Sequence, residues 1–413
     1  MKITLVHPLS GLVSYADNRM TLENNFISLG LCYLASELKS KEYQVSLIDA
    51  RRYQNEYEIL YKILEFSPDI IGFHCQCISY NFVKHMSELI KARYGNKHKI
   101  CVGGIHPTLK PDDFEFADYI FCGEGEKTFT ERIGNLDGDK VIQCERVEDL
   151  DNIRFPDREI YRDYKGKIQN KVVPLMEMPL VDIIIGRGCV YDCLFCQPSE
   201  RKLFGKMRMR SVDNVIEELK ELYSRYQFKS VFIHDDTFTW NKKWLDSFFG
   251  AVSNLDFKFK FICQGTVRDL ANGDELIKKM KSAGLETIII GFESGSQRIL
   301  DFIGKKVNVE DNIGVAEILK QNGIKIWANY MLGIPTETRE DIDETLKMIK
   351  EIEPEHRSPS FFTPHIGTYL YDYCIENNLI LTNDYDKQHR YPNEAKIKNI
   401  DYKYIVEKMR EEF

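Results

Sequence analysis

Short apolar runs rich in β-branched residues alternate with helical patterns, and this alternation constrains the fold more than any other feature. Five such runs lie in the first 140 residues: 2–6, 43–50, 69–75, 99–104 and 118–125. Strands that are apolar nearly throughout and joined by helices indicate a parallel sheet covered on both faces. We therefore predict an α/β fold that begins with a Rossmann-like or flavodoxin-like domain over 1–140.

A second series of strands and helices begins at residue 181. Its apolar runs are 181–186, 229–235, 258–264, 286–292, 324–332 and 357–365. Six strand–helix units are too few for a closed eight-unit barrel, so we predict an open, partial (β/α)6 barrel over 181–366. Charged and turn-forming residues fill 141–180, which we interpret as a linker, and 367–413 is predicted to be a helical tail.

Composition excludes several classes of protein. The 413 residues include 56 Lys and Arg against 64 Asp and Glu, a formal charge of -8, which disfavours a basic nucleic-acid-binding protein. No run of 18 apolar residues predicts a membrane span, and the first residues do not resemble an export signal. We therefore expect a cytoplasmic protein with no membrane or nucleic-acid partner, whose 11 cysteines are reduced and are either buried or metal ligands.

The sequence GRGCVYDCLFC follows the first strand of the second series and places Cys189, Cys193 and Cys196 in a Cys-x3-Cys-x2-Cys pattern. Three thiolates on one short loop can converge on a metal cluster and leave one position open. A structural zinc site normally has four ligands in two paired spacings, and no partner Cys-x2-Cys follows. A 4Fe–4S cluster with one iron not bound by cysteine is favoured; zinc and three buried cysteines are the alternatives.

This motif, at the end of the first strand of a partial barrel, resembles the radical S-adenosylmethionine (radical SAM) superfamily. The stretches VGGIHPT, GEGEKTF and GFESGSQRILDFIGK are similar to a subfamily in which a cobalamin-binding domain precedes the barrel. The resemblance implies that Cys189, Cys193 and Cys196 hold a 4Fe–4S cluster whose open iron chelates SAM. One electron would then cleave SAM and release a 5′-deoxyadenosyl radical.

The resemblance also suggests residues that contact SAM. Phe195 is placed to cover the adenine, or else anchors the loop. Asp235 and Asp236 end the second barrel strand, where one is expected to contact the methionine amino group while the other caps the following helix. Glu293 and Ser294 end the fourth strand and are expected to contact the ribose hydroxyls, with a helix N-cap as the competing role for Ser294.

Cobalamin is the third cofactor that the resemblance implies, held at the carboxyl ends of the first domain's strands. His7 stands where some relatives have an Asp-x-His-x-x-Gly motif, but the Asp and Gly are missing, so cobalt ligation competes with an ordinary strand-end histidine. Gly103 and Gly104 would let the nucleotide tail approach. Ser79 and Glu124 offer polar contacts.

The resemblance implies a cobalamin-dependent enzyme, in most cases a methyltransferase acting on an unactivated carbon or phosphorus. An oxidative cyclase or ring-rearranging enzyme that uses cobalamin without methyl transfer is the alternative. A non-catalytic cobalamin or metal sensor is the alternative of another class, and methylthiolation is disfavoured because no second three-cysteine cluster is present. The expected partners are a small-molecule substrate and an electron donor such as flavodoxin or ferredoxin.

Overall fold

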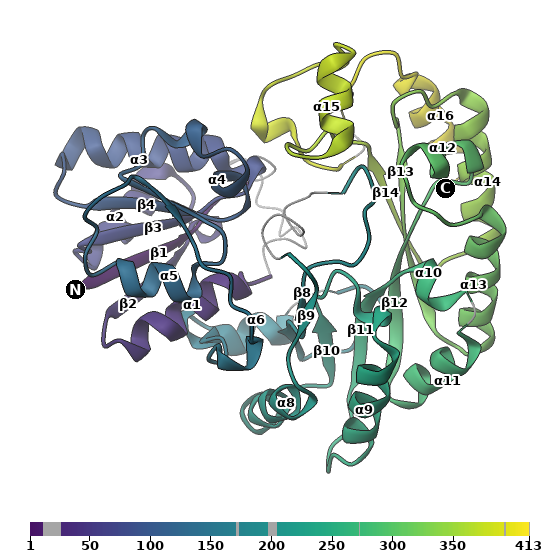
Figure 1. Cartoon of the computed structure of the whole chain (residues 1–413), viewed down its shortest axis with the longest axis horizontal. Helices are drawn as coiled ribbons and strands as arrows, with labels where there is room; N and C mark the ends of the chain where they lie inside the picture. Colours follow the sequence, from purple (N-terminus) through teal and green to yellow (C-terminus); the bar gives the residue numbers. More distant parts are fainter. Residues whose placement is uncertain (11–25, 171–172, 197–204, 272, 392–393, 413) are drawn as a thin grey trace. The chain divides into compact units, whose positions relative to one another are not determined.

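The computed structural model describes residues 1–413 except 11–25, 171–172, 197–204, 272, 392–393 and 413 (Figure 1). The chain divides into two compact units. Unit 1 contains Met1–Lys167 and Asp384–His389, and unit 2 contains most of the chain from Ile168 onward. Within the described part of the chain, no helix is long and apolar enough to cross a membrane.

Unit 1 is built on a six-stranded parallel sheet in the order β2-β1-β3-β4-β5-β6. The strands are β1 (Lys2–His7), β2 (Gln44–Asp49), β3 (Ile70–His74), β4 (Lys99–Gly103), β5 (Tyr119–Cys122) and β6 (Val141–Gln143). The order confirms the predicted doubly wound fold. Its switch point lies between β1 and β3, where His7 and His74 end neighbouring strands.

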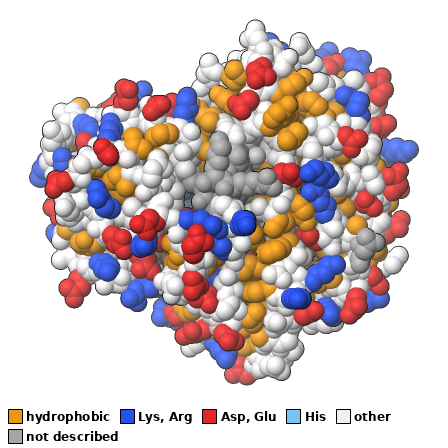
Figure 2. All heavy atoms as spheres, viewed as in Figure 1, with side chains coloured by type: hydrophobic (Ala, Val, Ile, Leu, Met, Phe, Trp, Pro, Cys, Tyr) orange, Lys and Arg blue, Asp and Glu red, His pale blue; other side chains and the backbone are white. Residues whose placement is uncertain are grey.

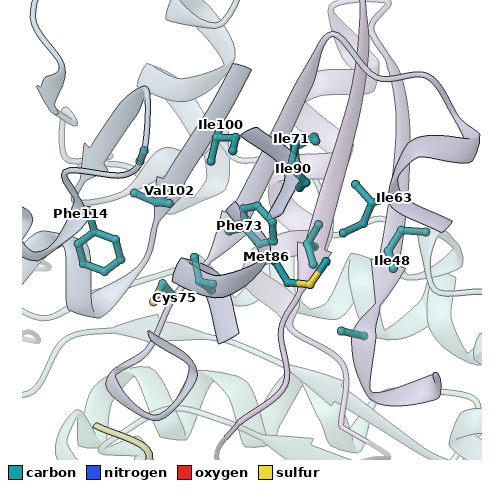
Figure 3. Close-up of a cluster of buried hydrophobic side chains, with 14 of the residues drawn as sticks. Ile48, Ile63, Ile71, Phe73, Cys75, Met86, Ile90, Ile100, Val102 and Phe114 are labelled. Carbon is teal, nitrogen blue, oxygen red and sulfur yellow. The ribbon is translucent and has the colours of Figure 1, made fainter. Parts of the chain in front are cut away.

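Helices join the strands of unit 1. They are α1 (Leu29–Ser40), α2 (Glu56–Glu65), α3 (Tyr80–Tyr94), α4 (Ile105–Leu109) and α5 (Gly125–Arg132), followed by α6 (Tyr164–Asn170). Ser28 and Asn55 cap α1 and α2 through their side chains. One core cluster joins strands β1–β5 to α2 and α3, with Phe73 and Met86 near its centre and Phe114 at one end (Figure 3).

The segment 141–180, which we expected to be a linker, contributes to unit 1 as far as Lys167. The reason is visible at its start, where Val141–Gln143 pairs with β5 and buries Ile142. The predicted helical tail, 367–413, is divided between the two units. The short 3-10 turn Tyr385–Lys387 belongs to unit 1, where the Tyr385 hydroxyl donates a 2.6 Å hydrogen bond to Asp113.

Unit 2 contains a second six-stranded parallel sheet, in the order β14-β13-β12-β11-β10-β7. The strands are β7 (Leu180–Ile183), β10 (Ser230–Ile233), β11 (Lys260–Gly265), β12 (Leu285–Glu293), β13 (Lys325–Leu332) and β14 (His356–Phe361). Among the described residues β7 and β14 each have one neighbour in this sheet, so it is open, as predicted for a partial (β/α)6 barrel.

The long helices of unit 2 lie along one side of this sheet (Figure 1). They are α8 (Val212–Tyr226), α9 (Lys242–Ser253), α11 (Asp274–Ser282), α13 (Val309–Gln321) and α14 (Arg339–Ile352); the other helices are α10 (Val267–Leu270), α12 (Gln297–Phe302), α15 (Tyr369–Glu376) and α16 (Tyr402–Glu412). The two-residue strands β8 (Gly186–Arg187) and β9 (Arg208–Met209) form an antiparallel pair beyond β7. On the face shown in Figure 2, basic and acidic side chains are interspersed.

Candidate active site

The cysteine loop leaves β8 and is fixed to the rest of unit 2 through its backbone. The Leu194 N–H donates to Ile303 O at 2.9 Å, and the Leu194 carbonyl accepts from the Leu370 N–H at 3.1 Å. The Cys196 N–H donates to Cys193 O at 3.2 Å, so these two cysteines bracket a tight turn. The two hydrogen bonds of the Leu194 backbone hold the turn between Cys193 and Cys196 against the rest of unit 2.

The three thiols differ in exposure. Cys189 and Cys193 are half-buried, Cys196 is exposed, and Cys189 Sγ lies 3.2 Å from Thr237 Oγ1. No three His, Cys, Asp or Glu side chains of the described residues are gathered closely enough to hold a metal ion. The donor set fits an iron–sulfur cluster in chemistry, because thiolates are the ligands such clusters prefer. The ligand roles of these cysteines stay a prediction.

A buried ion pair stands next to the loop. Lys305 Nζ lies 3.0 Å from Glu293 Oε1 and 5.9 Å from the ring centre of Phe195. Burial lowers the pKa of Lys305, but the charges of Glu293 and of the Cys193 and Cys196 sulfurs outweigh it and raise the pKa. Lys305 is thus a fixed cation facing both the carboxylate and the cysteines.

The backbone around Glu293 is shaped for this pair. Glu293 has a φ of 66°, in the left-handed region that non-glycine residues rarely adopt. A Cβ at position 291 would lie 3.2 Å from Lys305 Nζ and closer still to the Glu293 carboxylate, so Gly291 leaves room for both. Strained backbone that the surroundings hold in place is frequent at functional sites.

The charges of Lys305 and Glu293 also act on the Cys193 thiol. Burial raises its pKa, while the positive charges of Lys305 and Arg268 act in the opposite direction. Because a cluster ligand must be deprotonated, a nearby cation favours the ligating form.

The two aspartates after β10 have different surroundings. Asp235 is buried, and its Oδ1 accepts a hydrogen bond from the Ile185 N–H at 2.7 Å. Its Oδ2 has no hydrogen-bond partner among the described residues, and burial raises its pKa to about 7. Asp236 is exposed. Neither aspartate caps α9, a role that belongs to Asn241, whose Oδ1 accepts from the Trp244 N–H.

Ser294 points into the protein. Its Oγ lies 2.9 Å from Thr345 Oγ1 and accepts from the Ser296 N–H at 3.1 Å. The N-cap position of α12 is Ser296, so Ser294 is not that cap. The fully buried Ser294 hydroxyl ties two elements of unit 2 together, whereas Glu293 faces the loop.

In unit 1, His7 is held at the switch point of the sheet. Its Nδ1 lies 2.7 Å from the Tyr161 hydroxyl, which also accepts a hydrogen bond from the Ser28 N–H at 3.0 Å. Burial, followed by the positive charge of Arg51, holds the pKa of His7 well below its usual value, so the ring is neutral near pH 7. When Nδ1 carries the proton and donates to Tyr161, the lone pair of Nε2 is available to a metal.

The other residues predicted to bind cobalamin are used by the fold. Ser79 forms a capping box with Gln76, in which its hydroxyl accepts from the Gln76 N–H and donates to Gln76 O, both at 3.0 Å. Glu124 Oε2 accepts from the Val147 N–H at 2.8 Å. Gly104 has a φ of 114°, and a Cβ there would lie 2.7 Å from Cys75 O. Gly104 is therefore required by packing within unit 1, and a Cβ at Gly103 would make only ordinary contacts.

Sequence reasoning missed two residues that the structure brings to these places, Lys305 and Tyr161. The sequence contains an indication of Lys305, because the pair Gly304-Lys305 ends twelve positions after Glu293 of the GFES strand end. Tyr161 had none, since it lies 154 residues from His7 in a segment interpreted as a linker.

Comparison with known families decides the identity. The radical SAM superfamily profile matches residues 183–349, which contain the cysteine loop and β10–β13. This part of the chain is a radical SAM domain. A B12-binding domain profile matches residues 17–133, so the radical SAM domain is preceded by a cobalamin-binding domain. The protein is a radical SAM enzyme, and its two domains imply a 4Fe–4S cluster, SAM and cobalamin as cofactors.

Similar proteins cover nearly the whole chain. An uncharacterized methyltransferase of Pyrococcus horikoshii is 28% identical over 93% of this chain and 86% of its own. An anaerobic magnesium-protoporphyrin IX monomethyl ester cyclase of Rubrivivax gelatinosus is 27% identical over 88% of this chain and 68% of its own. The solved structure of the cobalamin-dependent radical SAM enzyme OxsB, at 19% identity, has a TM-score of 0.68 over 99% of this chain. The chain spans 61% of the OxsB chain.

Proposed function

We propose that this protein cleaves SAM reductively at a 4Fe–4S cluster held by Cys189, Cys193 and Cys196, and that it methylates an unactivated carbon or phosphorus of a small molecule with the help of cobalamin. The observation that carries the proposal is the position of the cysteine loop beside the buried Lys305–Glu293 pair. Three sulfur donors and a fixed pair of opposite charges are what a cluster and a zwitterionic SAM require.

Different residues of unit 2 would bind different groups of SAM. Lys305, whose ammonium lies 5.9 Å from the ring centre of Phe195 and pairs with Glu293, would neutralise the methionine carboxylate. Asp235 Oδ2 or Glu293 would accept from the amino group, because both are carboxylates at the ends of strands β10 and β12. The cluster, when bound, supplies the electron that breaks the sulfonium bond. Phe195, half-buried on the loop, would cover the adenine and exclude water.

His7 is the residue of this chain that we expect to bind the cobalt of cobalamin. Its Nε2 would be available as a ligand for the cobalt, with Tyr161 holding the ring through Nδ1 as an orienting partner does for other metal-bound histidines. Cobalamin, when bound, supplies the methyl group. Arg51 and Lys167 both pair with Asp49 beside this position, at 2.8 and 3.1 Å, and would stabilise negative groups nearby.

Metal content and SAM cleavage test the cluster. We would reconstitute the protein anaerobically with iron, sulfide and hydroxocobalamin, and compare wild type with the triple variant Cys189→Ala/Cys193→Ala/Cys196→Ala and with Cys144→Ala as a thiol control from unit 1. About four irons per chain and dithionite-dependent formation of 5′-deoxyadenosine should be lost only in the triple variant. Zinc in place of iron, or iron that survives the triple substitution, would overturn the proposal.

Cyclisation without methyl transfer is the second candidate, supported by the likeness to the cyclase of Rubrivivax gelatinosus. SAM labelled in its methyl group separates the two. Label found in the product supports methyl transfer, whereas an unlabelled product formed together with 5′-deoxyadenosine supports cyclisation or rearrangement.

A further inference from the structure

Two consecutive residues of the short helix α10 hold a tyrosine of the cysteine loop. The Arg268 guanidinium lies over the ring of Tyr191, with Cζ 4.7 Å from the ring centre. The Tyr191 hydroxyl donates a hydrogen bond to Asp269 Oδ1. Because Tyr191 lies between Cys189 and Cys193 in the sequence, contacts that fix its ring and its hydroxyl also restrain the loop between these two cysteines.

The Asp269 carboxylate is itself held in place by hydroxyl groups. Its Oδ2 accepts from Thr239 Oγ1 at 2.6 Å and from Thr266 Oγ1 at 2.8 Å. Thr266 is also the N-cap of α10, where its Oγ1 accepts from the Asp269 N–H at 3.3 Å. A carboxylate that accepts from three hydroxyl groups has a fixed orientation, so Asp269 determines where the Tyr191 hydroxyl lies.

Arg268 also contacts the turn that follows α12. Its Nη2 donates to the carbonyl oxygens of Gly304, at 3.2 Å, and of Lys305. This turn runs beside the cysteine loop, since the Leu194 N–H donates to Ile303 O at 2.9 Å. A Cβ at position 304 would lie 3.0 Å from Leu194 Cγ, so the two segments are closely packed. Arg268 therefore bridges the loop and the turn that contacts it.

Arg268 places a permanent positive charge beside the cysteines. The charges of Arg268 and Lys305 both act on Cys193. Lys305 is paired with Glu293 at 3.0 Å, whereas Arg268 makes no ion pair within the described part of the chain. A guanidinium keeps its charge at every pH at which proteins are studied. Arg268 is therefore a lasting source of positive potential at the loop.

A positive charge near an iron–sulfur cluster favours its reduction. Uptake of one electron makes the cluster and its thiolates more negative by one charge, and the reduction potential of such clusters depends on the charges and hydrogen bonds around them. The attraction between two charges is stronger in a partly buried site than in water. The SAM cleavage proposed above begins with this electron, so a residue that favours its uptake acts directly on that step.

We propose that Arg268 and Asp269 are positioning residues that hold the cysteine loop through Tyr191, and that the Arg268 charge makes the cluster easier to reduce. This inference rests on the proposed function, because it concerns the cluster assigned to the three cysteines of the loop. The reductant gives one electron to the oxidised cluster, and no bond to Arg268 forms or breaks.

The reduction potential of the cluster tests the role of the charge. Full-length wild type, Arg268→Gln and Arg268→Lys are reconstituted with iron and sulfide, without SAM, and the reduced cluster is followed by electron paramagnetic resonance during a redox titration. Arg268→Gln should lower the equilibrium constant for reduction at least tenfold, which makes the potential of a one-electron couple about 59 mV more negative. Arg268→Lys keeps the charge and should show less than half of this shift.

Arg225→Ala is the matched control, because it removes a surface arginine that pairs with Glu221 at 2.8 Å and should leave the equilibrium constant within about twofold. An unchanged potential in Arg268→Gln, or an equal shift in Arg268→Lys, would overturn the role of the charge. If Arg268→Gln takes up no iron, Arg268→Lys decides. An equilibrium constant within about threefold of wild type supports the role, and a tenfold fall overturns it.

Tyr191→Phe tests the positioning separately. The variant keeps the ring beneath Arg268 and removes the hydroxyl that Asp269 binds. In protein without iron, backbone amides of the peptide that contains 191–196 should exchange with deuterium at least about fivefold faster than in wild type. Tyr404→Phe removes a surface hydroxyl bound to Asp343 at 2.7 Å and should leave this exchange unchanged. Equal exchange in Tyr191→Phe and wild type would overturn the positioning role.

Failure of the inference can be told apart from failure of the proposed function. Wild-type protein that holds iron through the three cysteines and forms 5′-deoxyadenosine upholds the function, whatever the potentials of the variants. If the potential and the loop exchange are then the same in the variants as in wild type, the inference alone is wrong. If wild type binds no iron at these cysteines, the proposed function fails, and the role of the Arg268 charge fails with it.

Discussion

Both sheets place polar side chains at the carboxyl ends of parallel strands, yet the two units use them differently. In unit 1, Ser79 and Glu124 bind backbone groups of their own chain. In unit 2, Glu293 pairs with Lys305 beside the cysteine loop, and Asp235 Oδ2 has no hydrogen-bond partner among the described residues. A sheet covered on both faces turns its polar strand ends toward its own loops, whereas the long helices described in unit 2 lie along one side of its open sheet (Figure 1). A polar residue at a strand end is therefore stronger evidence for a site in unit 2.

The largest effect on stability and SAM affinity is expected at Lys305, because its pair with Glu293 has no counterpart at Ser79 or Glu124 of unit 1. Lys305→Ala leaves the Glu293 carboxylate buried without its partner, which should cost about 3 kcal/mol of unfolding free energy, at the low end for a buried pair because both side chains are slightly exposed. The dissociation constant for SAM should rise roughly 10- to 100-fold, since the cation for the carboxylate is gone. Chemical denaturation and calorimetric titration with SAM measure the two effects.

Lys306→Ala is the matched control for this change. Lys306 pairs with Asp192 at the surface, 3.1 Å away, so its loss should cost less than about 1 kcal/mol and leave SAM binding within twofold. Lys305→Arg should retain part of the affinity because the charge is kept. Equal SAM affinity in Lys305→Ala and wild type would show that the pair is only structural, as the polar residues of unit 1 are.

Most of the fold could be predicted from the sequence, because both parallel sheets are buried on at least one face and read as apolar runs at helix-spaced intervals. The ends of the elements were predicted to within a few residues, and β6 was missed because Val141–Gln143 buries only one of its three side chains. The cysteine loop was predictable because its ligand spacing is local. Tyr161 could not be predicted, since its contact with His7 depends on where a long irregular segment docks.

Glu337 in unit 2 accepts hydrogen bonds from backbone groups of its own chain, as Glu124 does in unit 1. It therefore tests whether the difference between the two units holds for every carboxylate. Its Oε2 accepts from the N–H groups of Gly333 and Ile334, and burial raises its pKa to about 8. Between pH 4.5, its usual pKa, and about pH 8, the folded protein keeps a proton that the unfolded chain has lost. This contribution to stability therefore falls as pH rises through that window, by at most about 1.4 kcal/mol per pH unit.

Glu337→Gln keeps an acceptor for the two N–H groups and removes the ionisation. The unfolding free energy of the variant minus that of wild type should thus increase from pH 5 to pH 8 and level off above it. Urea denaturation at several pH values measures this difference, in which the other titrating groups cancel. A difference that does not change with pH would mean that Glu337 is ionised in the folded protein throughout.

A smaller effect is expected at the one histidine of unit 1 for which we propose a ligand role. His7→Ala should weaken cobalamin binding by about tenfold and remove nitrogen splitting from the electron paramagnetic resonance spectrum of the reduced, cobalt(II) form. Tyr161→Phe, which removes only the group that orients Nδ1, should retain the splitting with a lower affinity. If the wild-type spectrum shows no nitrogen splitting, His7 is a strand-end histidine of the fold, like the other polar residues of this edge.

The smallest effect is expected at Ser79, where the comparison predicts a purely structural role. Ser79→Ala removes both side-chain hydrogen bonds of the capping box with Gln76, so the unfolding free energy should fall by about 1 kcal/mol. Cobalamin affinity should stay within twofold of wild type, because the hydroxyl is turned toward its own backbone. Urea denaturation and a spectroscopic cobalamin titration on the same protein give both numbers. A loss of affinity without a loss of stability would place Ser79 in the cobalamin site and make the two sheet edges alike.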